Sequence, residues 1–211
     1  RIPLVLTLHG TYAIPPEAHT IGARIKRRLM RFAYKTAAIT TTGSFATEER
    51  VRAIAPELPE CRFIPNGFDS KVFYYDAGVM GAERVLSVGW LKPRKGFDVV
   101  IEAMARLSTK YPNLSYRIIA GENDTPKLEY YRQLEKVIRQ YGLEKKVEIR
   151  LGPISRSQLA QEYRECAVFA LTSRDSGGHF EGFPLVYMEA FACGAPVVTT
   201  RGYGSNYAVQ N

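Results

Sequence analysis

The sequence predicts an α/β protein built on parallel sheets. From Arg84 onward, short apolar runs alternate regularly with longer segments of helical periodicity, which is the pattern of a doubly wound sheet. A second observation is that the loops richest in glycine, basic and acidic residues follow these apolar runs. In parallel sheets ligands bind beyond the carboxyl ends of the strands, so we expect the site at that edge.

The first part of the chain shows a shorter alternation of the same kind. The residues expected in strands are 3–8, 37–42 and 61–64, and those expected in helices are 21–35 and 44–54. The first strand ends at His9-Gly10, and a Pro-Asn-Gly-Phe-Asp turn at 65–69 precedes a linker.

The second part contains the regular alternation. Strands are predicted near 84–90, 116–120, 146–151, 166–172 and 196–200, and helices near 97–110, 127–141, 156–165 and 184–193. Ser155 and Gln158 have the spacing of a capping box at the helix 156–165.

The helix 21–35 has two neighbouring stripes. The apolar stripe comprises Ile25, Leu29 and Phe32, and the basic stripe comprises Arg24, Arg28, Arg31 and Lys35. We expect the core to need the apolar stripe and the basic stripe to be a solvated face. The alternative is peripheral contact of these four basic residues with an anionic membrane.

Composition is that of an ordinary globular protein of 211 residues, with 45% hydrophobic and 24% charged residues. No apolar run approaches the roughly 20 residues that span a bilayer. Cys61, Cys166 and Cys193 have no metal or redox spacing, so we expect reduced, buried thiols and a cytoplasmic location. The net charge of +8 suggests an anionic partner. Nucleic acid is not expected, and neither is a nicotinamide cofactor, because no Gly-x-Gly-x-x-Gly follows a strand.

The stretch 181–196, EGFPLVYMEAFACGAP, carries the clearest chemistry. Glu181 and Glu189 flank the opening of a helix, whose free backbone amides can hold an anion while the carboxylates accept hydrogen bonds from hydroxyls. Leu185, Met188 and Ala192 recur at helical spacing and predict the buried face, and Gly194 stands at the C-cap. The alternative is a core helix with two solvated glutamates.

This stretch resembles the glutamate–seven residues–glutamate signature of retaining glycosyltransferases with the GT-B fold, especially family 4. The turn at 65–69 and the basic loop 89–96, GWLKPRKG, also resemble motifs of that family. The resemblance covers essentially the whole chain and implies two Rossmann-like domains, the first only partly present. Residues 1–75 would form part of the acceptor-side domain, 76–83 a linker, and 84–211 a nucleotide-sugar-binding domain truncated at its end.

The resemblance also implies roles for individual residues. His9 and Glu181 would face the reacting sugar, and Glu189 would accept hydrogen bonds from the ribose hydroxyls. Lys95 would bind the donor diphosphate together with the segment Gly182, Phe183, Pro184 and Leu185, through the backbone N–H groups that this segment offers. Gly152, Pro153 and Ile154 would lie against the nucleobase. No metal or other cofactor is expected, since the chain has no Asp-x-Asp pair. The partners would be a nucleotide sugar and a glycan or lipid-linked hydroxyl acceptor, with retention of configuration.

Two positions depart from the family pattern. Trp90 stands where the family has an arginine, and Tyr207 stands where relatives often carry a glutamate. They keep open a non-catalytic, sugar-nucleotide-binding relative, and a GT-B sugar-nucleotide epimerase is a second alternative. The loop 173–180 is longer than usual, and its glycines Gly177 and Gly178 predict flexibility. It either shapes the sugar or acceptor pocket or is a surface insertion.

Overall fold

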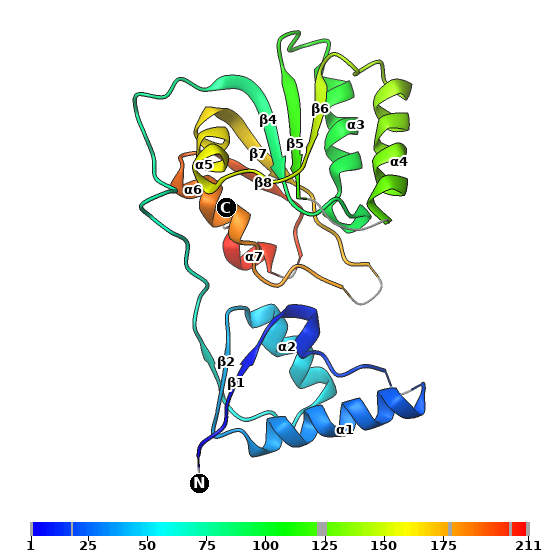
Figure 1. Ribbon diagram of the computed structural model, residues 1–211, viewed down its shortest axis with the longest axis vertical. Coiled ribbons are helices and arrows are strands. Elements are labelled where there is room, and N and C mark those ends of the chain that lie inside the picture. Colours follow the sequence, from blue (N-terminus) through cyan, green and yellow to red (C-terminus); the bar gives the residue numbers. More distant parts are fainter. Residues whose placement is uncertain (1, 18, 122–125, 177–178, 203, 210–211) are drawn as a thin grey trace. The chain divides into compact units, whose positions relative to one another are not determined.

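The computed structural model describes residues 2–17, 19–121, 126–176, 179–202 and 204–209 (Figure 1). Gly177 and Gly178 lie outside this range, as does the side chain of Tyr207. The chain divides into two compact units. Unit 1 comprises Arg1–Gly67, Asp175–Pro184 and Arg201–Asn211, and unit 2 comprises Phe68–Arg174 and Leu185–Thr200.

Unit 1 is built on a small parallel sheet in the order β1-β2-β3. Its strands are β1 (Val5–Leu8), β2 (Ile39–Thr42) and β3 (Cys61–Phe63), and its helices are η1 (Gly10–Ala13), α1 (Ile21–Thr36), α2 (Phe45–Ile54) and α7 (Ser205–Ala208). The helices α1 and α2 begin at capped ends: Thr20 accepts a hydrogen bond from Ala23 N, and Ser44 accepts one from Thr47 N. Tyr34 of α1, Val51 of α2 and Leu8 of β1 meet in one buried cluster.

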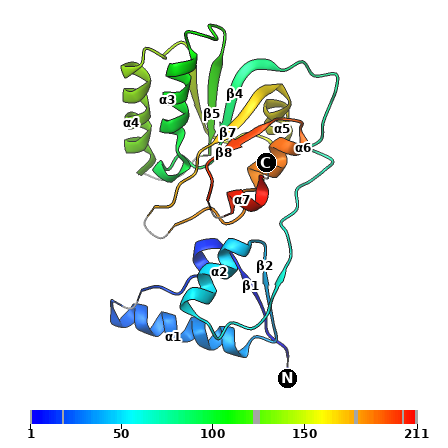
Figure 2. The ribbon, with the colours of Figure 1, turned by 180° about the vertical axis from the view of Figure 1, so that it is seen from behind.

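Unit 2 is a doubly wound sheet with the order β6-β5-β4-β7-β8, and all its pairings are parallel. Its strands are β4 (Ala82–Val88), β5 (Ser115–Ala120), β6 (Val147–Leu151), β7 (Cys166–Leu171) and β8 (Val197–Thr199). Its helices are η2 (Pro93–Lys95), α3 (Phe97–Leu107), α4 (Pro126–Gln140), α5 (Arg156–Glu165) and α6 (Leu185–Ala192). Figures 1 and 2 show α3 and α4 on one face of this sheet and α5 and α6 on the other. The predicted α/β class with parallel sheets is confirmed.

Local signals in the sequence explain where two of these helices begin and end. Ser155 and Gln158 form the predicted capping box at the start of α5. At the end of α6, Gly194 has a φ of 88°, and Ala195 N bonds to Ala190 O at 3.0 Å. With the bond from Gly194 N to Phe191 O, this is a Schellman ending, as the C-cap position of Gly194 predicted.

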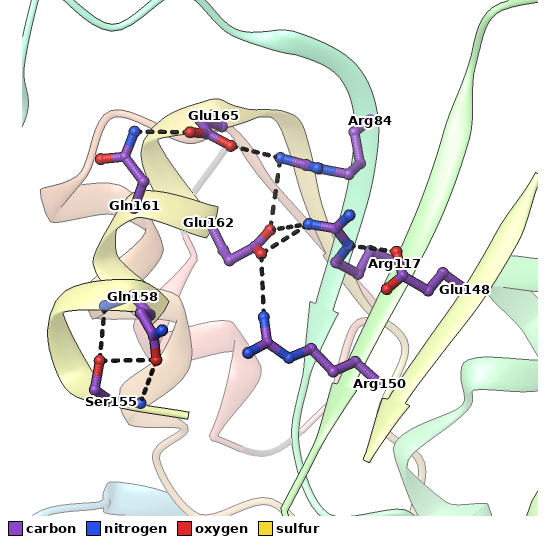
Figure 3. A network of polar contacts seen from close by, with 9 residues as sticks. All are labelled: Arg84, Arg117, Glu148, Arg150, Ser155, Gln158, Gln161, Glu162 and Glu165. Atoms are coloured by element: carbon purple, nitrogen blue, oxygen red, sulfur yellow. Dashed lines mark hydrogen bonds and ion pairs between the residues drawn. The ribbon is translucent and has the colours of Figure 1, made fainter. Parts of the chain in front are cut away.

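A charged network holds α5 on the sheet (Figure 3). Glu162 is buried and accepts hydrogen bonds from Nη1 of Arg117 at 2.7 and 2.8 Å. Arg84 and Arg150 approach the same carboxylate at 3.5 and 3.8 Å. Because three strands each supply one of these arginines, a single helical carboxylate ties α5 to β4, β5 and β6.

Two predictions about helix faces were wrong. In α6 the buried residues are Tyr187 and Ala190, whereas Leu185 is 39% exposed. The helix is apolar nearly all round, so spacing alone did not identify its buried face. Tyr187 lies on that face, and its hydroxyl donates a hydrogen bond to Leu171 O at 3.0 Å. In α1 the apolar stripe is not in the core, because Leu29 and Phe32 are 63% and 65% exposed.

Candidate functional site

A cavity of about 450 Å³ in unit 1 gathers several of the predicted site residues. Its wall includes His9, Gly10, Thr11, Tyr12, Gly43, Ser44, Thr47, Asn66, Phe180, Glu181, Gly182 and Phe183. His9 is exposed and follows β1, while Glu181 is half-buried and reaches the cavity from a segment far along the chain. An imidazole, a carboxylate and several hydroxyls in one cavity are suited to bind a polyol.

The backbone around Glu181 is held closely. Ser44 Oγ donates to Gly182 O at 2.8 Å, and Gly204 N donates to Glu181 O at 3.0 Å. A side chain at Gly204 would lie 1.5 Å from Gly182 O, so only glycine allows this approach. A Cβ on Gly182 would lie 3.3 Å from Thr47 Oγ1. The glycines therefore let this segment lie directly on the start of α2.

Lys95 belongs to unit 2, in the basic loop after β4. It is 6% exposed, and its aliphatic stem lies near Gly89, whose Cβ would be 3.6 Å from Cε. Gly96 follows with a φ of 69°, and a Cβ there would lie 2.1 Å from Thr172 O. Trp90, at the position of the family's arginine, is 51% exposed. Lys95 is thus held in a turn that requires glycine at position 96, and this turn packs against the end of β7.

Glu189 lies in α6 of unit 2 and is half-buried. Its carboxylate accepts a hydrogen bond from the Tyr163 hydroxyl at 3.2 Å. Burial raises the pKa of Glu189 above its ordinary value of 4.5, and the bond from Tyr163 opposes that rise. A carboxylate with spare acceptor capacity in such a setting is suited to bind hydroxyls.

The remaining predicted residues occupy the ends of strands and helices. Gly152 is buried with a φ of 113°, and Pro153 and Ile154 connect it to the cap of α5. Pro184 is buried and belongs to unit 1, whereas Leu185 opens α6 in unit 2. The structure thus brings His9 together with Glu181, Gly182 and Phe183 in one cavity, and it places Lys95, Glu189 and the 152–154 segment in the other unit.

Two residues of α2 at this site were missed by the sequence reasoning. Thr47 is fully buried, and its Oγ1 has no hydrogen-bond partner among the described residues. Arg50 forms an ion pair with Asp175 and lies over the ring of Phe180. With Ser44 they recur every three residues along one helical face, a spacing that gives no hint of a partner so distant in the sequence.

The basic stripe of α1 lines a second cavity, of about 430 Å³. Its wall consists of Arg24, Arg27, Arg28, Arg31, Phe32, Lys35 and Glu57. Arg31 donates to both oxygens of Glu57, and this hydrogen-bonded contact lowers the pKa of Glu57 to about 2. Five cations and one acid line this cavity in the described part of the chain, so the net charge of its wall is positive.

Two features are absent from the described residues. Within residues 2–209, less the gaps given above, no three histidine, cysteine, aspartate or glutamate side chains cluster closely enough to hold a metal ion. No helix in that same range combines the length and apolar character required to cross a bilayer.

The family profile described as "Glycosyl transferases group 1" matches residues 79–211. Among curated relatives, the GDP-mannose-dependent alpha-(1-6)-phosphatidylinositol monomannoside mannosyltransferase of Mycolicibacterium smegmatis is 27% identical over 96% of this chain and 53% of its own. The D-inositol 3-phosphate glycosyltransferase of Geodermatophilus obscurus is 35% identical over 79% of this chain and 36% of its own. The chain therefore spans about half, or less, of the length of these relatives.

Solved structures show the same fold. HepE of Anabaena, in complex with UDP-glucose, superposes with a TM-score of 0.77 at 25% identity, over 99% of this chain and 56% of HepE. The sucrose-phosphate synthase of Thermosynechococcus elongatus superposes equally well, at 24% identity over 96% of this chain and 51% of its own. The two parallel sheets are thus those of the GT-B fold. The chain belongs to the glycosyl transferases group 1 family.

Proposed function

We propose that this chain belongs to a retaining glycosyltransferase that moves a sugar from a nucleoside-diphosphate sugar to a hydroxyl acceptor. The observation that carries the proposal is the cavity in which His9 and Glu181, from distant parts of the sequence, meet. Family membership supports the class of reaction. The proposed setting is polysaccharide, glycolipid or glycoconjugate assembly at the cytoplasmic side.

The proposed chemistry assigns each group one task. Glu181 accepts hydrogen bonds from sugar hydroxyls near the anomeric carbon, and His9 faces the same sugar. The acceptor oxygen attacks that carbon as its bond to the diphosphate breaks, on the same face, and the acceptor proton passes to the departing diphosphate oxygen. Lys95 and the backbone N–H group of Leu185 stabilise the charge that develops on this leaving group, with no metal required. The backbone N–H groups of Gly182 and Phe183 hold hexose oxygens. Glu189 binds the ribose hydroxyls, and residues 152–154 contact the base.

The names of the relatives support a proposal for the classes of donor and acceptor. HepE was solved with UDP-glucose, and the Mycolicibacterium relative is named for GDP-mannose and a phosphatidylinositol monomannoside. Another relative is named for D-inositol 3-phosphate. We propose a UDP- or GDP-sugar donor and a polyol or lipid-linked polyol acceptor for this chain.

Ligand-observed NMR tests the donor site. Saturation transfer to UDP-, GDP-, dTDP- and ADP-sugars is measured with the wild type and with Glu189→Ala and Lys95→Ala. We expect transfer to one nucleotide and its loss in both variants; Glu148→Ala, at an exposed carboxylate on β6, is the control that should bind normally. Binding that survives in both variants would contradict these assignments.

Turnover by the complete protein separates the proposal from its rivals. Incubation of the donor with polyol acceptors should yield a glycoside whose anomeric configuration matches the donor. Nucleotide binding without turnover would favour the non-catalytic relative, which Trp90 suggests. Conversion of the donor sugar with no acceptor present would favour an epimerase.

A specific observation favours peripheral membrane contact as an accompanying function. The apolar side chains of α1 that the sequence assigned to the core, Ile25, Leu29 and Phe32, are exposed, and Phe32 lines the basic cavity. Ile21, at the start of α1, is exposed as well. An apolar stripe beside a row of cations is the surface that inserts at an anionic bilayer.

Sedimentation with vesicles tests this contact. The complete protein should sediment with phosphatidylcholine–phosphatidylglycerol vesicles and less with phosphatidylcholine alone. Charge reversal of Arg24, Arg28, Arg31 and Lys35 should abolish the difference, whereas Lys26→Glu, on the same helix but outside the cavity wall, should not. Equal sedimentation of the reversed variant would refute membrane contact.

A further inference from the structure

One arginine of α2, Arg50, contacts the segment that carries Glu181. The guanidinium of Arg50 forms an ion pair with Asp175, at the start of the segment, and lies 4.4 Å from the ring centroid of Phe180, immediately before Glu181. The two charged side chains are only 23% and 33% exposed, so solvent screens their attraction incompletely. A cation held both by a carboxylate and over a ring is fixed in two directions.

The other side of Glu181 is tied to the same helix. Ser44, the N-cap of α2, donates to the carbonyl of Gly182, as described above. Arg50 and Ser44 therefore contact the segment on either side of Glu181, and both contacts come from one face of α2. Phe180 is 4% exposed and lines the His9 cavity, so the ring that Arg50 holds is also part of the wall beside Glu181.

We propose that Arg50 is a positioning residue, which holds Asp175 and Phe180 on α2 so that Glu181 stays in the cavity with His9. This inference rests on the proposed function, because holding Glu181 in the cavity matters for turnover only if Glu181 contacts the reacting sugar there. Arg50 does not act on the sugar; it acts through Asp175 and Phe180. The inference favours the interpretation in which the loop 173–180 shapes the pocket, because Phe180 lines the His9 cavity.

Steady-state kinetics of the complete protein, with its identified nucleotide sugar, test the inference. Arg50→Met keeps the aliphatic stem but removes the charge, and we expect kcat to fall about tenfold or more with a smaller rise in the KM for the donor. The KM should change less than kcat because Lys95 and Glu189, which belong to unit 2, still bind the nucleotide. Arg50→Lys, which retains the charge, should recover a substantial part of kcat, and Asp175→Asn should lower kcat less than Arg50→Met does.

Arg52→Met is the matched control. Arg52 lies on the same helix but bonds Glu48 and the carbonyls of Leu58 and Pro59, away from the Glu181 segment. We expect this variant to unfold at lower temperature while its kcat stays within about twofold of the wild type. If Arg50→Met behaves in the same way, Arg50 is merely structural and the inference is overturned.

Hydrogen–deuterium exchange provides a readout that needs no turnover. The peptide over residues 179–184 should exchange faster in Arg50→Met than in the wild type or in Arg52→Met. Unchanged exchange in Arg50→Met would overturn the inference whatever the activity. A wild-type protein that binds nucleotide but transfers no sugar would instead overturn the proposed function, so the two failures are distinguishable.

Discussion

At the scale of single residues, Glu189 is a proposed binding group whose ionisation lowers the free energy of unfolding. Burial raises the pKa of its carboxyl, so between its ordinary value of 4.5 and the raised folded value the native state binds more protons than the unfolded state. The free energy of unfolding therefore falls as pH rises through that window and stays lower above it. The cost is retained because, in our proposal, the ionised carboxylate binds ribose.

We predict that Glu189→Gln removes this cost. A glutamine can still accept the bond from Tyr163, so the variant should unfold at a higher temperature than the wild type at pH 7, with the difference vanishing below pH 4.5. Thermal unfolding followed by circular dichroism from pH 4 to 8 measures this. Tyr163→Phe is the control: it removes a bond that lowers the pKa of Glu189, so the loss of stability with rising pH should grow. A gap between wild type and Glu189→Gln that does not depend on pH would contradict the linkage.

Two buried threonines of unit 1 permit a matched comparison. Thr47 Oγ1 has no partner among the described residues, whereas Thr42 Oγ1 bonds the backbone N–H and carbonyl of Ser44. We predict that Thr47→Val leaves the free energy of unfolding unchanged or raises it by up to about 1 kcal/mol, and that Thr42→Val lowers it by about 1–3 kcal/mol. Chemical denaturation of both variants tests this. Similar losses in the two would mean that Thr47 is satisfied in solution.

At the scale of elements, two glycines with left-handed φ values allow the free-energy cost of the backbone conformation to be separated from the cost of a steric clash. Gly96 and Gly142 have nearly equal φ values, 69° and 64°, but a Cβ at Gly96 would meet Thr172 while one at Gly142 would meet nothing within 4 Å. Gly142→Ala should lower the free energy of unfolding by about 1–2 kcal/mol, which is the cost of the left-handed conformation alone. Gly96→Ala should cost well over twice that and weaken nucleotide binding through the displaced Lys95. Denaturation and nucleotide titration measure both; equal costs would show that the loop shifts freely.

The docking of α5 gives a second element-scale prediction. Glu162 meets three arginines and is buried, whereas Glu148 meets Arg117 with a side chain that is 57% exposed. Glu162→Gln leaves partly buried guanidinium groups short of a partner and should lower the free energy of unfolding by about 2–4 kcal/mol. Glu148→Gln should lower it by less than about 1 kcal/mol. Urea denaturation distinguishes these, and equal effects would show that solvent reaches the network.

The same scale shows what sequence could predict. The order of strands and helices, the capping box at Ser155 and the C-cap at Gly194 follow from local chemistry, which a short window of sequence contains. The buried face of α6 could not be predicted in this way, because a helix that is apolar nearly all round has no preferred side until it packs against a neighbour. The exposed stripe of α1 was likewise misassigned, since periodicity distinguishes two faces but not which of them is covered. At the site, Glu181 and Glu189 were marked by family spacing, whereas Arg50 and Thr47 matter through contacts across the fold.

At the scale of the whole molecule, the division into two units predicts how ligands act on stability. Lys95, Glu189 and the 152–154 segment all belong to unit 2, whereas His9 and Glu181 belong to unit 1. A nucleoside diphosphate without its sugar should bind the unit 2 groups and stabilise that unit by mass action, by about 2.7 kcal/mol at one hundred times its Kd. We therefore predict that UDP or GDP raises one calorimetric transition of the chain and leaves the other within about a degree. Lys95→Ala should abolish the shift, and Glu181→Gln should preserve it because that carboxylate is proposed to contact only the sugar. A shift shared equally by both transitions, or lost in Glu181→Gln, would show that the diphosphate also depends on unit 1 and that the assignment of roles between Glu181 and Glu189 has to be redrawn.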